Sequence, residues 1–112
     1  MITLQDEIEF EDLMETRPLV LVCFHSTRSA YSRRTMQHLH ELEPEFLQLK
    51  FYTVDVDRIE FVLLVHRFAV VAIPTLILFG DGRRADFLVG ERSQKTFSSL
   101  LNSFLNSKTQ SP

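Results

Sequence analysis

The spacing of apolar and polar positions divides the chain into segments of strand length and segments of helix length. The run 19–24 is apolar without alternation, which is typical of a strand covered on both faces in the middle of a sheet. Apolar runs at 76–79 and 85–89 flank Gly80-Asp81-Gly82, a tight-turn sequence that predicts an antiparallel hairpin. The pattern as a whole predicts strands at 2–4, 19–24, 51–57, 76–79 and 85–89, and helices at 7–15, 32–47, 58–68 and 93–105.

Individual residues mark where several of these helices begin, bend or end. Asp6 is a candidate N-cap for the first helix, and Ser93 opens the last. Pro44 interrupts the helix 32–47, and because its ring clashes with the preceding turn it should kink this helix or split off its last turn. The polar sequence 108–112 predicts a disordered C-terminal tail after a domain that spans 1–107.

Size, charge and cysteine content limit the number of domains, the kinds of partner and the roles open to the cysteine. A chain of 112 residues with 45% apolar residues can form one domain around one core. A net charge of −3 argues against nucleic acid or an anionic membrane as the main partner. The sequence 1–7 lacks the basic and apolar regions of a signal peptide, so we expect a cytoplasmic location. The single cysteine, Cys23, cannot form an internal disulfide and is expected to act as a small hydrophobic residue in its strand.

Three short sequences carry a resemblance to a known family. Ser29-Ala30-Tyr31-Ser32 follows the apolar strand 19–24 and opens a helix, Asp55-Val56-Asp57 closes the third strand, and Ile73-Pro74-Thr75 begins the fourth. With these sequences in this order, the chain resembles the thioredoxin family over nearly its whole length. The resemblance implies a single α/β domain of the thioredoxin-like fold, with a mixed central sheet and helices on both faces.

The resemblance also implies that Ser29 and Ser32 occupy the positions of the two cysteines that make a thioredoxin an enzyme. Thiol–disulfide exchange needs a thiolate, and a serine hydroxyl is not ionised near neutral pH and forms no disulfide. Cys23 aligns with the family's proton-handling aspartate, and Arg28 aligns with an aromatic residue that usually precedes the first cysteine. We therefore predict no catalytic residues and no cofactor.

These losses favour a redox-inactive protein-binding module, either chaperone-like or a subunit or adaptor of a larger assembly. Two other classes remain open. One is a thioredoxin-type oxidoreductase whose two cysteines were replaced by serine in the laboratory, which would turn Cys-Ala-Tyr-Cys into the sequence at 29–32. The other is a small binder of glutathione or a similar thiol ligand.

A peptide groove can persist without the thiols. In the family the bond before the proline is cis and leaves the preceding residue, here Ile73, free to pair with an extended peptide. The alternative interpretation is that Pro74 only begins a strand. The predicted walls of the groove are Tyr31, Val71, Ala72, Ile73, Pro74, Val89 and Gly90.

A cluster of basic residues surrounds the start of the second helix. Arg28 and Arg33, with Arg34 beside them, could hold a carboxylate or phosphate near the helix N-terminus, or they could form an ordinary solvated surface. The histidines do not have metal-site spacing, because His38 and His40 point to different faces of one helix. We therefore predict no metal site.

The helix 58–68 is apolar on almost every face. Its apolar residues form two stripes: Phe61, Leu64, Val65 and Phe68 in one, and Ile59, Val62 and Leu63 in the other. The sequence does not say which stripe is inward, and a deeply seated helix could bury both. Because exposed contiguous apolar surface usually marks an interface, we predict that one stripe contacts another protein molecule. That molecule is either a protein partner or a second copy of this chain, which would form a homodimer.

Overall fold

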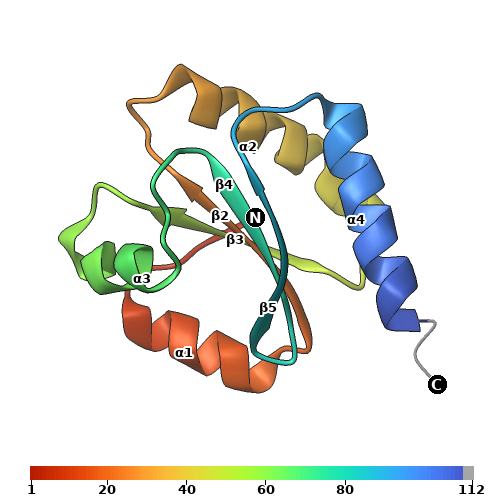
Figure 1. Ribbon diagram of the computed structural model, residues 1–112, viewed down its shortest axis with the longest axis horizontal. Coiled ribbons are helices and arrows are strands. Elements are labelled where there is room, and N and C mark those ends of the chain that lie inside the picture. The colour runs from red at the N-terminus through yellow and green to blue at the C-terminus, as the bar shows by residue number, and fades with distance from the viewer. Residues whose placement is uncertain (110–112) are drawn as a thin grey trace.

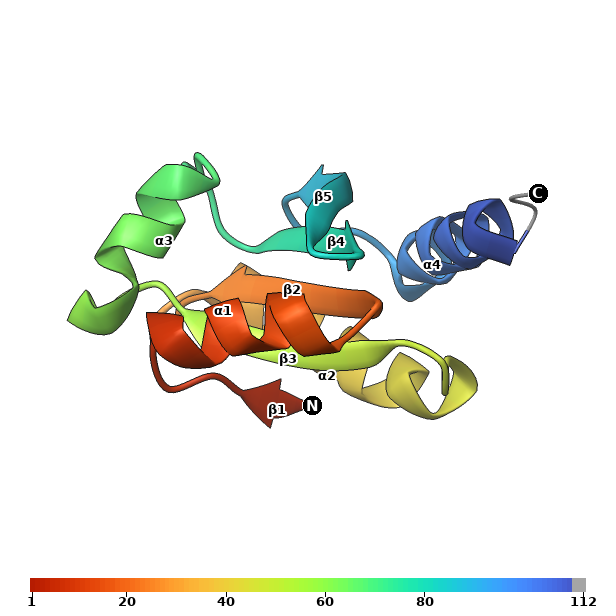
Figure 2. The same cartoon turned by 90° about the horizontal axis from the view of Figure 1, so that it is seen from below.

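The computed structural model describes residues 1–109, which form a five-stranded sheet between two layers of helices (Figures 1 and 2). The order of strands across the sheet is β1-β3-β2-β4-β5. In chain order the elements are β1 Ile2–Thr3, α1 Glu7–Thr16, β2 Leu19–His25, α2 Ala30–Leu42, the 3₁₀ turn η1 Glu43–Glu45, β3 Lys50–Asp55, the 3₁₀ turn η2 Ile59–Phe61, α3 Val62–Arg67, β4 Thr75–Gly80, β5 Arg83–Val89 and α4 Gln94–Thr109.

The strand β2 lies at the centre of the sheet, as its apolar run predicted. It pairs in parallel with β3 and antiparallel with β4, so Cys23 stands between Thr53 and Leu76. Every residue from Val20 to His25 is buried. The mixed sheet with helices on both faces confirms the predicted thioredoxin-like fold.

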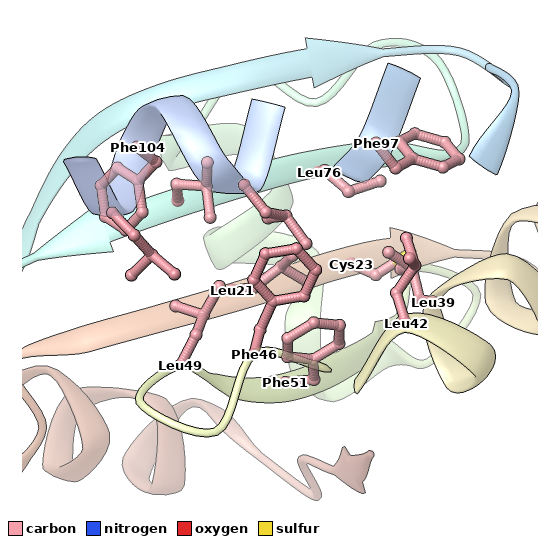
Figure 3. Close-up of a cluster of buried hydrophobic side chains, with 13 residues drawn as sticks. Leu21, Cys23, Leu39, Leu42, Phe46, Leu49, Phe51, Leu76, Phe97 and Phe104 are labelled. Atoms are coloured by element: carbon pink, nitrogen blue, oxygen red, sulfur yellow. The ribbon is translucent and has the colours of Figure 1, made fainter. Parts of the chain in front are cut away.

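Successive side chains of β2 serve two separate cores, because residues along a strand point to opposite faces. Val20, Val22 and Phe24 join the core beneath α1 and α3. Leu21 and Cys23 join the core beneath α2 and α4, where they meet Leu39 and Leu42 of α2 and Phe97 and Phe104 of α4 (Figure 3).

The hairpin between β4 and β5 forms where its turn sequence predicted. Asp81 and Gly82 both have positive φ, at 53° and 79°, which is the pattern of a two-residue type I′ turn. A Cβ atom at Gly82 would lie 3.0 Å from the main-chain oxygen of Met14, so the close approach of α1 also favours glycine there. β5 begins at Arg83, two residues earlier than expected, because a turn this short continues the pairing directly.

Several helix boundaries differ from the prediction. α2 ends at Leu42 rather than at 47, and Pro44 lies in the separate turn η1. Of the two predicted effects of its ring, a kink or a split, the structure shows the split. The segment 58–68 is not one helix, since η2 precedes a short α3. α4 continues to Thr109 and so includes the first two residues of the predicted tail, and the rest of that tail, 110–112, lies outside the described residues.

No helix within residues 1–109 is long and apolar enough to cross a membrane. Over the same residues, no three His, Cys, Asp or Glu side chains are grouped so that they could hold a metal ion.

Candidate functional site

Ser29 and Ser32 both have hydrogen-bonding roles at the start of α2. Ser29 is the N-cap, and its Oγ accepts a hydrogen bond from the main-chain N–H of Ser32 at 3.2 Å. Ser32 is fully buried, and its Oγ accepts a hydrogen bond from the N–H of Ser26 at 3.2 Å. The two hydroxyls therefore fix the loop between β2 and α2 to the first turn of the helix.

Asp57, after the end of β3, ties the same loop to the neighbouring strand. Its carboxylate accepts a hydrogen bond from the hydroxyl of Ser26 and pairs with the guanidinium of Arg28, whose Nη2 lies 3.1 Å from Oδ1. The hydrogen bonds from Arg28 and then Ser26 lower the pKa of Asp57. For His25, burial lowers the pKa, although Asp55 and Asp57 oppose that shift. Asp57 was not predicted as a partner of this loop.

The basic residues predicted as a possible anion site have partners inside the chain. Arg28 pairs with Asp57, and Arg33 donates to the main-chain oxygen of Thr27 at 2.9 Å. Arg34 pairs with Glu91 through Nε and Nη2, and the hydrogen bond from Arg34 lowers the pKa of Glu91. Two of the three guanidinium groups are thus neutralised, which leaves less positive charge for an external anion than the sequence suggested.

The predicted groove residues gather at one end of the sheet. The Ile73–Pro74 peptide bond is cis, and the N–H of Gly90 donates to the oxygen of Pro74 at 2.7 Å. Tyr31 lies on the same side, because the guanidinium of Arg34 covers its ring at 5.2 Å and pairs with Glu91, next to Gly90. The loop segment between α3 and β4, visible in Figure 1, thus faces both the start of α2 and the end of β5.

Several groove residues expose apolar surface or free main-chain groups. Val71 is 94% exposed and Tyr31 is 59% exposed, and Val89 is also exposed. Pro74 is buried and Ile73 is half-buried. Among residues 1–109, the main-chain N–H and C=O of Ile73 have no hydrogen-bond partner. The site therefore offers apolar contacts beside unpaired main-chain groups.

The chain's only thiol is far from solvent. Cys23 is fully buried in the core between the sheet and α2 (Figure 3). Burial raises the pKa of Cys23 from 9.0 to about 12, because the thiolate would lose its hydration. The expectation of a small hydrophobic role agrees with this environment.

The two apolar stripes of the segment 58–68 face opposite ways, and the hypothesis that both are internal is wrong. Phe61 and Leu64 are fully buried beneath the sheet, so they are core residues and not the interface residues that the sequence suggested. Val65 packs against the same core and is half-buried. The other stripe, here called the outer face of α3, is exposed and consists of Ile59, Val62 and Leu63.

Comparison with known proteins agrees with this geometry. The sequence model of the family described as Thioredoxin matches residues 1–103. The chain belongs to the thioredoxin family. It is 31% identical over 87 residues to Thioredoxin-2 of Pyricularia oryzae, an alignment that covers 78% of this chain and 50% of that protein. It is 29% identical over 87 residues to Phosducin-like protein 3 of Drosophila melanogaster, covering 78% of this chain and 39% of that protein.

Solved thioredoxins share the fold of this family member. Thioredoxin from Plasmodium falciparum superposes with a TM-score of 0.85 at 20% identity, covering 93% of this chain and 99% of that one. Oxidised mitochondrial thioredoxin 3 from Saccharomyces cerevisiae superposes with a TM-score of 0.82 at 21% identity. The superposition covers 92% of this chain and 94% of that one. The chain spans half or less of the length of the two curated relatives, so the activities of those whole proteins do not transfer to it directly.

Thr35, one turn after Ser32, gives a first prediction about this helix. It is fully buried, and its hydroxyl is the one buried side-chain polar atom without a hydrogen-bond partner in the described chain. Thr35→Val replaces that hydroxyl with a methyl group of the same size, so we expect the free energy of unfolding to rise by about 1 kcal/mol. Denaturant titration measures the change.

Ser32→Ala is the matched control, since Ser32 is buried on the same helix but its hydroxyl has a partner. Removing that acceptor leaves the N–H of Ser26 unpaired, so this variant should lose about 1 kcal/mol instead. If both substitutions lower stability equally, the hydroxyl of Thr35 has a partner after all.

Proposed function

We propose that this chain is a thioredoxin-like module that binds protein and performs no thiol–disulfide exchange. One observation carries the proposal: two serine hydroxyls stand at the N-terminus of α2, while the only thiol is fully buried with its pKa raised to about 12. Exchange requires a thiolate that can reach a disulfide, and its intermediate requires a second sulfur to resolve it. Neither group is accessible in residues 1–109.

The groove around Ile73 is the proposed binding surface. Its unpaired main-chain groups can hydrogen-bond an extended segment, as an added strand would. Exposed Val71 and Tyr31 supply apolar contacts on either side. The ion pair between Arg34 and Glu91 holds Tyr31 near Gly90 and so keeps the two sides of the groove together.

We also propose that the outer face of α3 mediates self-association. Ile59, Val62 and Leu63 form an exposed apolar surface on one short segment. The charges beside it are already paired within the chain, Arg58 with Glu60 at 3.1 Å and Arg67 with Glu11. An apolar face without unpaired charge around it suits a second copy of itself, because neither copy then loses hydration of an unpaired charge.

An insulin-reduction assay with dithiothreitol tests the absence of exchange chemistry. We expect the rate to equal the dithiothreitol background, because Ser29 and Ser32 supply no thiolate. The double variant Ser29→Cys with Ser32→Cys is the informative comparison. It should give weak activity at most, since Cys23 stands where the family resemblance puts a proton-handling aspartate.

Two results would contradict the proposal. Activity of the unaltered protein above background would show that it exchanges disulfides. A double variant as active as a thioredoxin would favour the competing hypothesis of an oxidoreductase whose cysteines had been replaced. The serines of the native protein can be verified by mass spectrometry.

A further inference from the structure

An apolar hollow of about 170 Å³ lies on the sheet face that also carries α1 and α3. It is bounded by the segment that follows α3, including Phe68 and Val71, and by side chains of β4 and β5. In Figure 2 this segment runs from α3 towards β4, with β5 beside it. A closed apolar cavity of about 150 Å³ accepts a molecule of benzene, so the hollow has room for one apolar side chain.

Three side chains of β5, those of Arg84, Phe87 and Val89, line the hollow. Arg84, Phe87 and Val89 pair with Phe79, Ile77 and Thr75 of β4, which are successive residues on one face of that strand. The irregular register between Leu78 and Phe79 allows Arg84 and Phe87 to be neighbours on this face although three positions separate them. The strand therefore presents one cation followed by two exposed apolar side chains.

Arg84 is available to an external carboxylate. Its guanidinium lies 5.3 Å from the centre of the Phe87 ring, and within residues 1–109 it forms none of the ion pairs found for other arginines. An unpaired cation at the border of an apolar hollow is complementary to a partner that combines an apolar anchor with an acidic residue.

The position of β5 in the sheet supplies main-chain contacts as well. It is the last strand in the order β1-β3-β2-β4-β5, so one of its sides has no neighbouring strand among the described residues. An extended segment can pair with such an edge and present alternate side chains to one face. β4 places every second residue opposite Val89, Phe87 and Arg84 because of the register shift. An antiparallel segment that keeps this register on the free edge would place apolar, apolar and acidic residues at every second one of its own positions.

We propose that the hollow and the edge of β5 form a docking site for an extended acidic–apolar peptide segment, in which two alternate apolar residues precede a glutamate or aspartate. The inference rests on the proposed protein-binding function. The site shares Val71, Ala72 and Val89 with the groove at Ile73, but it is centred on Arg84 and Phe87, which are not part of that groove. Arg84 selects the acidic residue of the peptide, and Phe87 and Val71 select its apolar residues.

The probe is the blocked heptapeptide Ser-Leu-Thr-Leu-Thr-Glu-Ser, titrated into the ¹⁵N-labelled full chain and followed by amide chemical shifts. We expect shifts concentrated at 84–89 and at Val71 and Ala72. A peptide with serine in place of both leucines should bind at least roughly tenfold more weakly, because each buried leucine contributes apolar area. A peptide with lysine in place of glutamate should bind roughly threefold more weakly.

Variants of the protein separate the contributions. Arg84→Glu should reverse the preference, so that the lysine peptide binds better than the glutamate peptide. Arg83→Glu is the matched control, since it makes the same charge change one residue away but does not line the hollow, and the preference should persist. Phe87→Ala should weaken all leucine peptides.

The results also distinguish this inference from the proposed function. Shifts confined to Tyr31, Ile73 and Gly90 would overturn the docking site at β5 while supporting the groove. No shift at any amide at millimolar peptide would overturn the docking site, and the insulin assay would still decide the absence of exchange chemistry. A dimer that Phe87→Ala dissociates would identify a second copy as the occupant, and the peptide assignment would be wrong.

Discussion

Leu64→Asp is expected to unfold the protein, whereas Val62→Asp is expected to leave it folded and abolish self-association. Leu64 is fully buried in the core under the sheet, and a carboxylate there would be both unpaired and dehydrated. The lost apolar contacts and the buried charge together should cost about 4 kcal/mol or more, a large part of the stability of an ordinary domain. Circular dichroism during denaturant titration measures this loss.

Val62 is two residues earlier but belongs to the outer face of α3, where its side chain is 59% exposed. Val62 is the first residue of α3, so an aspartate in its place would also interact favourably with the positive end of the helix dipole. The free energy of unfolding should therefore change by less than about 0.5 kcal/mol. Only association should respond, because a charge on each copy would face the other across the interface.

Light scattering across a concentration series decides between these outcomes. A dimer that Val62→Asp converts to a folded monomer supports the interface. An unaltered protein that is monomeric at every concentration would rule out self-association through this face. Leu63→Asp, on the same face, is an independent repeat with the same expected result.

The fold could be predicted from local signals because the decisive ones are short-range. The uninterrupted apolar run of β2 requires burial on both faces, and Asp81-Gly82 favours a hairpin through backbone conformation alone. The helix ends were less predictable. Pro44 allowed either a kink or a split, and the choice depended on how the following turn packed, with Phe46 and Leu49 in the core beneath α2.

The positions of the candidate groove residues could be predicted, but the ion pairs around them could not. Resemblance to the family located Tyr31, Ile73 and Pro74, which lie together at one end of the sheet. The partners of Arg28 and Arg34 are 29 and 57 residues away in the chain, at Asp57 and Glu91, and no local pattern encodes such contacts. Without them the arginines look like an anion site.

The orientation of α3 and the hollow at β5 could not be predicted from the sequence either. Two apolar stripes on one short segment are equivalent by periodicity, and only packing against Phe10 and Phe79 identified the inward one. The hollow depends on the register shift that brings Arg84 beside Phe87 on one face. A strict two-residue alternation would put these side chains on opposite faces.

Cys23 should be almost unreactive towards thiol reagents in the folded protein. At pH 8, a thiol whose pKa is raised from 9.0 to about 12 contains about a thousandfold less thiolate, and the reagent also has no path to a fully buried sulfur. Reaction with an aromatic disulfide reagent should therefore be at least about a thousandfold slower than in denaturant, and it should proceed only through opening of the fold.

The matched control moves the single thiol to the start of α2, in the double variant Cys23→Ala with Ser29→Cys. This thiol lies at a helix N-terminus on a partly exposed residue, where the dipole lowers a thiol pKa, so it should react rapidly in the folded state. If Cys23 in the unaltered protein reacts as fast as this control, its sulfur is accessible, and the proposed absence of thiol chemistry loses its main support.

The same raised pKa predicts how stability depends on pH. The folded protein binds the proton of Cys23 more tightly than the unfolded chain does, so this contribution is complete below pH 9.0 and is lost as pH rises towards about 12. Between those values the free energy of unfolding should fall by about 1.4 kcal/mol per pH unit through this group. Tyrosines and lysines also titrate there, so the difference between the unaltered protein and Cys23→Ala isolates the thiol. Parallel pH dependences in the two proteins would show that the thiol titrates alike in the folded and unfolded states.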